Sequence, residues 1–558
     1  MSNIDWFVLI STLAFIVGYG TWRTRKNKDL DGYLRGGSDM GWLTIGLSVM
    51  ATQASAITFI STPGLAYESG MGFVQNYFGL PLALIIVCVV FLPIYYKLKV
   101  YTAYEYLEGR FDLKVRILTA SLFLVQRGLA AGITIYAPAI ILSTMLGWNL
   151  SFTILLVGIL VIVYTVSGGT KAVSLTQKWQ MSVILLGMGI AFYILLNSMP
   201  EGIGLFESLQ IAGASGRMDV VDFSFDLDKR YTFWTGITGG LFLALSYFGT
   251  DQSQVQRYLS GKSLKQSRMG LIFNAILKIP MQFMILLTGV LVFVFYQFEQ
   301  HPVLFNQVAI EEVRQSEFAS EFKEIEEKHA IFHAKKKKAI LAYTKAPNKE
   351  KDALLNLDKR GKEIRNEAKA IVLKANKDQS SKDSDYVFLT FILNYLPKGI
   401  IGLLIAVIIS AAMSSTAGEI NALASTTMVD FYQRLGKKEL NDQEKVTVSK
   451  WFTLLWGAIA ITFALFARLV ENLIEAVNIL GSVFYGTILG VFLTAFFLKF
   501  VKAKSVLIAA ILAQATVFIL FFSKQIDISY LWYNLIGCAL VFFGALIIQF
   551  GFLAVEKK

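Results

Sequence analysis

The sequence predicts an all-α, polytopic membrane protein with about thirteen transmembrane helices. Of its 558 residues, 55% are hydrophobic, and the mean hydropathy is +0.55. Only 16% of the residues are charged, and they separate apolar runs of about 20 residues, the length that crosses the hydrocarbon core of a bilayer. A soluble chain of this length would instead divide into domains with charged surfaces.

The predicted spans follow one another along almost the whole chain. They lie near residues 5–22, 42–66, 72–96, 117–146, 150–167, 173–196, 232–250, 270–297, 386–428, 451–470, 473–498, 504–523 and 528–553. The fourth and ninth are longer than a bilayer requires, so we expect them to include bent or extramembrane portions.

Lys and Arg concentrate in alternate loops. The loop after the first span contains Arg23, Arg25, Lys26 and Lys28, whereas loops 67–71 and 147–150 contain no Lys or Arg. Short cytoplasmic loops retain basic residues. We therefore predict an integral plasma membrane protein, in a bacterium of the inner membrane, with the N-terminus outside and the C-terminus cytoplasmic. The same rule explains the net charge of +12, so no nucleic-acid partner is expected.

The region 298–385 interrupts the apolar pattern with interleaved charges, and it reads as two helices broken near Pro347. By the loop order it lies outside the membrane, where we expect a solvated helical hairpin that caps the outer face. A partner-docking or gating role is the alternative. The chain's three histidines, His301, His329 and His333, lie in or beside this region. The predicted spans therefore lack the histidines that a membrane-embedded enzyme would need, and no enzymatic activity is expected.

Two segments inside predicted spans are unusually polar. They are SVMATQASAITFISTPG (48–64) and ISAAMSSTAGEINALASTT (409–427). Small polar residues commonly form hydrogen bonds between membrane helices. However, the density of hydroxyl groups, the bulky Gln53 and the Pro63-Gly64 pair also fit a discontinuous helix, whose free carbonyl and hydroxyl oxygens replace the water shell of a sodium ion.

These two segments and five others, in their order along the chain, resemble the sodium/solute symporter family of sodium-coupled sugar, proline, sialic acid, iodide and monocarboxylate carriers. The matching segments are DGYLRGGSDMGW (31–42), SVMATQASAITF (48–59), TAYEYLEGRFD (102–112), GITIYAPAIIL (132–142), YTVSGGTKAV (164–173), DQSQVQRYLS (251–260) and AAMSSTAGEINALAS (411–425). The resemblance covers nearly the whole chain except 298–385.

This resemblance implies a leucine-transporter-like fold with a 5+5 inverted repeat, in which the second and seventh spans are broken. The implied segments are a peripheral first span and loop (1–41), the first repeat (42–196), an outer loop (197–231), the start of the second repeat (232–297), the charged insert (298–385), the rest of the second repeat (386–498) and two peripheral spans (499–558).

The resemblance also implies one sodium site. Carried onto this sequence, its ligands are the carbonyl groups of Ala51, Ala54 and Ala411 and the hydroxyl groups of Ser414 and Ser415. Some relatives bind a second sodium ion with hydroxyl and carboxylate groups, but the matching positions here are Ala417, Gly418 and Gln177. We expect a buried Lys178–Glu419 pair to fill that space, and one sodium ion per cycle.

Substrate in this fold binds near the midplane, against the broken helices. The candidate wall residues are Gln53, Ser55, Thr58, Asn76, Arg127, Phe242 and Tyr247. Arg127 would lie roughly 16 Å deeper than Arg116 on one helix. An arginine at that depth faces a partner or a cavity, and its planar fork suits a carboxylate. A structural salt bridge to Glu419 is the alternative.

The expected function is sodium-coupled secondary active symport that imports a small organic anion, either sialic-acid-like or a monocarboxylate, by alternating access. A neutral solute such as a sugar, polyol or amino acid is one alternative. An uncoupled facilitator or a transporter-like sensor is another. The expected partners are Na+, the solute and the lipid bilayer. A monomer is compatible with the sequence, which does not identify a partner for the insert.

Overall fold

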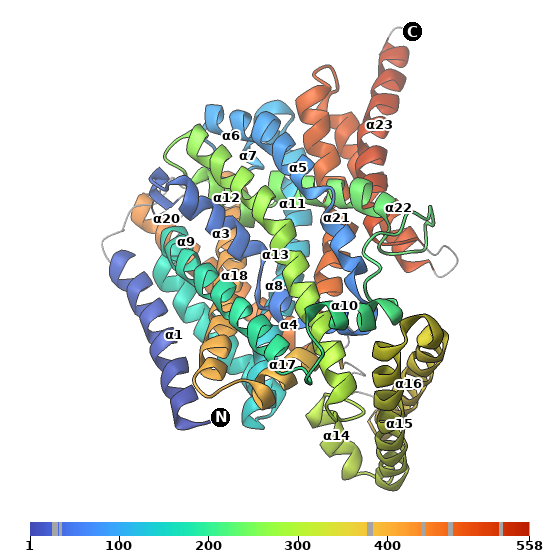
Figure 1. Ribbon diagram of the computed structural model, residues 1–558. Coiled ribbons are helices and arrows are strands. Elements are labelled where there is room, and N and C mark those ends of the chain that lie inside the picture. Colours follow the sequence, from blue (N-terminus) through green and yellow to red (C-terminus); the bar gives the residue numbers. More distant parts are fainter. Residues whose placement is uncertain are drawn as a thin grey trace.

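The computed structural model describes residues 1–24, 32, 36–376, 383–436, 441–466, 473–523 and 528–556. Within these residues the protein is a bundle of helices (Figure 1). The elements are α1 (Asn3–Thr24), η1 (Gly36–Ser38), α3 (Trp42–Gln53), α4 (Ala56–Ser69), η2 (Met71–Tyr77), α5 (Leu80–Ile86), η3 (Val87–Phe91), α6 (Leu92–Leu98), α7 (Glu105–Arg110), α8 (Leu113–Leu146), α9 (Leu150–Asn197), α10 (Leu205–Ala214), η4 (Thr235–Gly239), α11 (Gly240–Gly249), α12 (Gln252–Leu259), α13 (Leu264–Phe298), α14 (Gln307–Arg314), α15 (Ala319–Lys345), α16 (Pro347–Ala375), α17 (Ser384–Tyr395), α18 (Ile400–Thr426), η5 (Thr427–Tyr432), α19 (Gln433–Leu435), α20 (Asp442–Phe466), α21 (Leu473–Phe497), α22 (Ala503–Phe522) and α23 (Leu531–Glu556).

The apolar helices coincide with the predicted spans. Among the described residues, nine helices are long and apolar enough to cross a membrane. The pair α3 and α4 passes the same test as one bent span, and three shorter apolar helices lie at Asn3–Ile16, Leu150–Val163 and Thr235–Gly249. Each predicted span overlaps one of these helices. The all-helical membrane architecture is therefore confirmed, while the repeat symmetry stays a prediction.

Three breaks in the helices lie within or between predicted spans, and in each case the backbone at a few residues gives the reason. The predicted fifth and sixth spans are the two arms of α9, Leu150–Val163 and Gly169–Asn197, which meet at a kink where Gly169 leaves helical geometry at φ 59° and ψ −173°. The predicted ninth span is two helices, α17 and α18, and the second begins after Gly399 at φ 89°. The seventh span continues beyond Thr250 as α12, so its break lies at the predicted end.

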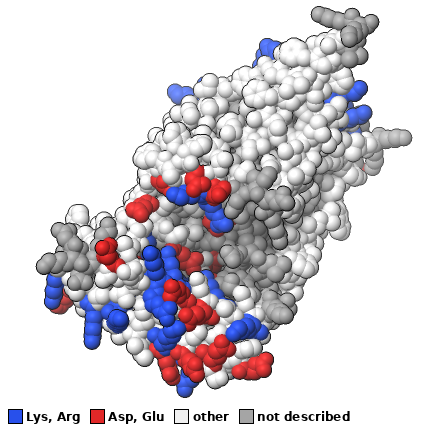
Figure 2. All heavy atoms as spheres, turned by 90° about the vertical axis from the view of Figure 1, so that its right-hand side faces the viewer, with Lys and Arg blue, Asp and Glu red and all other residues white. Residues whose placement is uncertain are grey.

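The charged insert is a helical hairpin, with Pro347 at the first position of its second long helix, as predicted. Helices α15 and α16 pack together, and a small apolar cluster that includes Phe322, Ile364 and Val372 fills the insert. Figure 1 places this hairpin at the same end of the molecule as the N-terminus, while the C-terminus lies at the opposite end. Figure 2 views the molecule from the right-hand side of Figure 1. Charged side chains gather at one end of the face that it shows, and most of the rest of that face is free of them.

Helices α4 and α18 lie in the interior of the bundle. Helix α18 is buried almost throughout from Ile401 to Thr426, including its polar residues, as expected of a helix at the centre of a membrane bundle. Helix α4 packs against α17 and α13 at two glycines. A Cβ atom on Gly64 would lie 1.8 Å from the Ser384 carbonyl oxygen, and one on Gly289 would lie 2.1 Å from the Pro63 carbonyl oxygen. Glycine at these two positions allows the backbones to touch.

Candidate functional site

The site is built around a break between α3 and α4. Helix α3 ends at Gln53, Ser55 is extended at φ −73° and ψ 176°, and α4 begins at Ala56. The two helices are bent by 54°. Because a helix end leaves its last carbonyl groups without intrahelical partners, the break exposes backbone oxygens in the middle of a membrane-crossing segment.

The predicted sodium ligands converge on this break. The Ser415 hydroxyl of α18 donates a hydrogen bond to the Ala51 carbonyl oxygen at 3.1 Å. The Ser414 hydroxyl is buried and has no hydrogen-bond partner among the described residues. Ala51, Ala54 and Ala411 belong to one packed cluster of buried residues. An unpartnered hydroxyl beside free carbonyl groups fits a hard cation that prefers oxygen ligands, so these residues suit a sodium ion.

The space proposed for a second sodium ion is occupied differently from the prediction. The Gln177 amide oxygen accepts a hydrogen bond from the Ser48 hydroxyl at 2.5 Å, and its NH2 group donates to the Thr52 hydroxyl at 3.0 Å. The Lys178–Glu419 pair does not form. The Lys178 ammonium lies 5.9 Å from the Trp179 ring centroid, and Glu419 pairs with Arg127 instead. Gln177 thus forms hydrogen bonds between α9 and α3.

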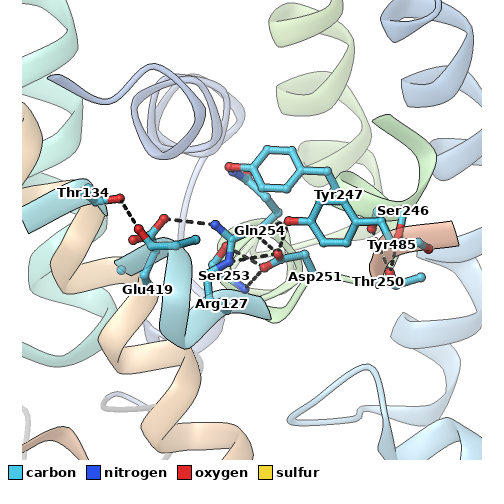
Figure 3. Close-up of polar contacts among 12 residues, drawn as sticks. Arg127, Thr134, Ser246, Tyr247, Thr250, Asp251, Ser253, Gln254, Glu419 and Tyr485 are labelled. Atoms are coloured by element: carbon cyan, nitrogen blue, oxygen red, sulfur yellow. Dashed lines mark hydrogen bonds and ion pairs between the residues drawn. The ribbon is translucent and has the colours of Figure 1, made fainter. Parts of the chain in front are cut away.

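A buried charge cluster lies beside the break (Figure 3). The Arg127 guanidinium on α8 donates to the Glu419 carboxylate on α18 at 3.0 Å and to the Asp251 carboxylate at 3.1 Å from Nε. Its Nη2 also donates to Asp251 and to the Tyr485 hydroxyl on α21, and Tyr485 donates to Asp251 at 2.7 Å. One cation therefore faces two carboxylates, so the ionised cluster has a net charge of −1.

Asp251 reaches Arg127 because of the interruption between α11 and α12. Its other carboxylate oxygen caps the N-terminus of α12, where it accepts hydrogen bonds from the Ser253 backbone N–H at 2.9 Å and the Ser253 hydroxyl at 2.6 Å. Aspartate is a favoured N-cap residue. Thr134 on α8 lies next to the Glu419 carboxylate (Figure 3). The cluster thus links α8, the α11–α12 break, α18 and α21.

A cavity of about 100 Å³ lies between the α3–α4 break and this cluster. Its lining residues are Thr52, Gln53, Ser55, Ile57, Asn76, Tyr77, Leu80, Arg127, Thr134, Gly240, Leu243, Ala244, Tyr247, Phe248, Glu419, Ile474, Val477, Asn478 and Tyr485. Of the predicted wall residues, Thr58 and Phe242 are not part of this lining. Thr58 is buried within α4, and Phe242 on α11 packs against the core.

Three buried polar atoms of the cavity lining have no hydrogen-bond partner among the described residues. They are the amide oxygens of Gln53 and Asn76 and the amide nitrogen of Asn478. Burial of such groups without a partner costs about 1–3 kcal/mol each. Their convergence on one cavity indicates a place for a small polar molecule.

The sequence reasoning missed Asp251, Tyr485 and Asn478. Asp251 carries a local signal, because an aspartate that follows an apolar helix and precedes a polar helical segment is typical of an N-cap. Tyr485 and Asn478 lie within an apolar span on α21, and no neighbouring pattern distinguishes them from packing residues.

Comparisons with known proteins agree with this geometry. The model of the Sodium:solute symporter family matches residues 33–321 and 368–513. The chain is 28% identical over 508 residues to the sodium/iodide cotransporter of Homo sapiens, with 90% of this chain and 67% of that protein covered. It is 27% identical over 507 residues to sodium-coupled monocarboxylate transporter 2 of Bos taurus, with 90% and 70% covered.

Two further comparisons cover nearly all of the chain. It is 26% identical over 542 residues to the sodium/sialic acid symporter SiaT of Proteus mirabilis, with 96% of this chain and 92% of that protein covered. The fold is similar to a solved structure of a Na+-coupled sialic acid symporter in a substrate-bound outward-open state, with a TM-score of 0.76, 23% identity and 98% of each chain covered. The family model does not match residues 322–367, which form the greater part of the α15–α16 hairpin.

Proposed function

Because the chain belongs to the sodium:solute symporter family, we propose that it imports a small polar organic solute together with sodium, by alternating access, through the cavity beside the α3–α4 break. The observation that carries this proposal is the contact between Ser415 on α18 and the Ala51 carbonyl group at the break. This contact supports a sodium site in which the serine pair of α18 and the carbonyl groups at the break lie near each other.

In this mechanism the sodium ion joins α3 and α18 through the oxygen atoms of Ala51, Ala54, Ala411, Ser414 and Ser415. An inward membrane potential adds about 2.3 kcal/mol per charge per 100 mV to its entry. Gln177 fills the neighbourhood of a second cation site with hydrogen bonds to Ser48 and Thr52, which supports one sodium ion per cycle. A charge-to-solute ratio near two in coupled flux measurements would contradict this stoichiometry.

We place the N-terminus and the α15–α16 hairpin on the extracytoplasmic side of the membrane and the C-terminus on the cytoplasmic side. The alternation of basic loops supports this orientation. Single cysteines at the exposed Lys338 and at Lys502, labelled in intact cells by a membrane-impermeant maleimide, test it. We expect labelling at position 338 only, and the reverse pattern would contradict the proposed orientation.

For the solute, the cavity favours a hydrogen-bond donor over a simple anion. Among the described residues, the buried amide oxygens of Gln53 and Asn76 are acceptors without a partner, and the Asn478 amide nitrogen is a donor without one. Arg127, the predicted carboxylate ligand, already faces Asp251 and Glu419. A free anion would enter a cluster with a net negative charge, and it would have to displace one carboxylate. We therefore propose a neutral or zwitterionic solute rich in hydroxyl or amino groups, such as a sugar, polyol or amino acid.

An anionic solute is the second candidate. The relatives named above carry iodide, monocarboxylates or sialic acid, and an arginine fork remains the natural partner of a carboxylate. A thermal-shift screen in sodium against potassium separates the two candidates, because a bound ligand raises apparent stability. Sugars, polyols and amino acids should raise the melting temperature in sodium. A shift produced only by sialic acid, lactate or iodide would contradict the neutral solute.

The sodium site is tested by Ser414→Ala and Ser415→Ala. Loss of one oxygen ligand should raise the half-saturating sodium concentration for uptake about tenfold, which corresponds to about 1.4 kcal/mol. Thr416→Ala is a matched control on the same helix, because the Thr416 hydroxyl donates to the Ala412 carbonyl group within α18. Unchanged sodium dependence in both serine variants would contradict the proposed site.

A further inference from the structure

A second cavity, of about 260 Å³, lies between α9 and α13 on the flank of the bundle. We call it the α9–α13 groove. Its lining residues are Met50, Phe59, Leu185, Met188, Gly189, Leu277, Pro280, Met281, Met284, Ile285 and Thr288. Thr288 has the only polar side chain among them, and its hydroxyl donates to the Met284 carbonyl group at 2.8 Å. The lining therefore offers no free side-chain polar group to a water molecule.

An apolar cavity without polar partners excludes water and accepts hydrocarbon. A dry cavity of about 150 Å³ is already large enough to bind benzene. Four of the lining residues are methionines, whose unbranched and flexible side chains adapt to irregular apolar ligands. The chemistry of the groove is therefore that of an alkyl-chain site.

The groove opens toward the lipid. Leu185 and Met284 at its rim are 38% and 42% exposed, whereas Met50 and Phe59 at its floor are 0% and 1% exposed. Next to the rim, Leu186 on α9 and Ile276 on α13 are 61% and 66% exposed. Both helices are long and apolar enough to cross the membrane. The medium at the mouth is thus the hydrocarbon of the bilayer, and the molecules that can enter from it are membrane lipids.

The floor of the groove is formed by residues on the two sides of the α3–α4 break. Met50 directly precedes Ala51, and Phe59 lies in the first turn of α4. Both pack in the same buried cluster as Ala51, Ala54 and Ala411. An occupant of the groove would lie over Met50 and Phe59, which flank the backbone segment that carries the proposed sodium ligands Ala51 and Ala54.

We propose that the α9–α13 groove binds one acyl chain of a bilayer lipid, and that this chain holds the α3–α4 break in the geometry that binds sodium. The second half of the proposal rests on the proposed function, whereas the first half does not. The chain fills the groove above the floor that Met50 and Phe59 form, and the headgroup stays outside the apolar lining. Removal of the lipid leaves the groove empty and weakens sodium binding.

Gly189 provides a way to fill the groove. A Cβ atom at this position meets no heavy atom within 4 Å, so a larger side chain projects into open space. Gly189→Phe and the smaller Gly189→Leu should each occupy the site of the acyl chain. Gly18→Phe is the matched control, because Gly18 on α1 is also exposed and also has open space around its Cβ position, but lies outside the groove lining.

Photolabelling tests the lipid site. In proteoliposomes that contain phosphatidylcholine with a diazirine in its acyl chain, we expect the label to concentrate in the peptides that span 185–189 and 277–288. Labelling there should fall at least fivefold in Gly189→Phe and Gly189→Leu and stay unchanged in Gly18→Phe. An even distribution of label over all lipid-facing helices, or equal labelling in the Gly189 variants, would overturn the proposal.

Sodium binding tests the coupling. For the delipidated wild-type protein in detergent, we expect the half-saturating sodium concentration of the thermal shift to rise at least threefold, and to recover when phosphatidylcholine is added. Gly189→Phe should show neither change. If photolabelling is specific to the groove but the sodium affinity is the same with and without lipid, the proposed coupling is wrong. Absence of any sodium-dependent shift would instead refute the proposed sodium site, while the photolabelling pattern still decides whether the groove binds lipid.

Discussion

Two of the regions in which this protein buries charged groups use them differently. In the membrane core, Arg127 pairs with Asp251 and Glu419 beside a cavity whose wall keeps unpaired polar atoms. At the junction between the hairpin and the core, Arg365 pairs with Asp383. Asp358 of the hairpin lies 3.9 Å from Arg217 and also pairs with Lys336, within the hairpin, at 2.5 Å. The first cluster joins helices that the family model matches, and the second anchors a hairpin that lies largely outside that match.

The difference distinguishes a candidate ligand site from a structural attachment. The core cluster carries an unbalanced negative charge and faces a space for a ligand. The junction instead uses its charges to attach one element to another: the Asp383 carboxylate also accepts a hydrogen bond from the Asn306 backbone N–H at 3.1 Å, and the Arg217 guanidinium stacks on the Phe293 ring at 3.5 Å. We therefore expect changes in the core to alter transport, and changes at the junction to alter mainly the attachment of the hairpin.

The largest effect is expected for Asp251→Asn. The amide can still cap α12, but it offers Arg127 a neutral partner, and loss of one member of a buried ion pair typically costs about 3–5 kcal/mol. We expect a lower melting temperature and no measurable uptake. Wild-type uptake in this variant would show that the core cluster is only structural.

A smaller and more local effect is expected for Asp383→Asn. This change weakens the contact with Arg365 and should loosen the hairpin by about 1–3 kcal/mol. Faster hydrogen exchange across residues 319–375, with sodium affinity unchanged, is the expected result. A loss of sodium affinity as large as that of the Ser414 variant would remove the distinction between the two regions.

Acid pH should loosen the junction in the same way. All three histidines of the chain meet there, with the His301 ring centroid 4.9 Å from His329 and 5.4 Å from His333. Burial, together with neighbouring cationic groups, lowers the pKa of His329 to about 4, and burial also lowers the pKa of His301 and His333. The charged groups that act on this cluster are Arg365, Lys336, Lys337 and Glu299.

The direction of the pH effect on hairpin attachment follows from these lowered pKa values. A detached hairpin exposes histidines with an ordinary pKa of about 6.5, so the detached form binds more protons, and the attachment weakens as the pH falls from about 6.5 toward 4. Burial raises the pKa of Asp358, but the neighbouring cations Lys336 and Arg217 lower it by more, so its pKa lies below the ordinary value. Asp358 therefore stays ionised over most of this pH range. After correction for the intrinsic slowing of amide exchange in acid, the protection factors across 319–375 should be lower at about pH 5 than at about pH 7.5. His329→Gln should reduce that difference, and an unchanged difference would contradict the role of the histidines.

The smallest effect is expected at an ion pair on the surface of the insert. The Arg314 and Glu326 side chains lie 2.8 Å apart and are 56% and 27% exposed. Because exposed pairs contribute little, Glu326→Gln should change the free energy of unfolding by less than about 0.5 kcal/mol. A larger loss would mean that the insert depends on its surface charges more than on its apolar cluster.

Local patterns predicted much of this molecule. Apolar runs located the spans, and the polar residues in 48–64 indicated a discontinuous helix. The break lies at Ser55, however, and the Pro63-Gly64 pair is inside the continuous helix α4. The pairing of Ala51 with Ser415 was implied by the family resemblance. Depth along one helix indicated that Arg127 faces a partner. The partners themselves depend on packing between distant segments: Asp251 reaches Arg127 only because α11 ends at Gly249, and His301 meets His329 only because the hairpin folds back on the core.

The paired charges explain why the carboxylate hypothesis for Arg127 was incomplete. An isolated arginine in a span indicates that a counter-charge is needed, but it does not distinguish a solute from a side chain. Glu419 was the alternative partner in the sequence, and it is one of the two partners present. The Lys178–Glu419 pair failed for the same reason, because closeness in register does not decide which helix face a side chain occupies.

The break between α3 and α4 also sets the direction of the local electric field. The C-terminal end of α3 carries the negative pole of one helix dipole, and the N-terminal end of α4 carries the positive pole of the other. Two opposite poles thus lie a few residues apart, at Gln53 and Ala56. A cation is drawn to the first and an electron-rich oxygen to the second, so a solute in the cavity would be oriented with its most electronegative end toward α4.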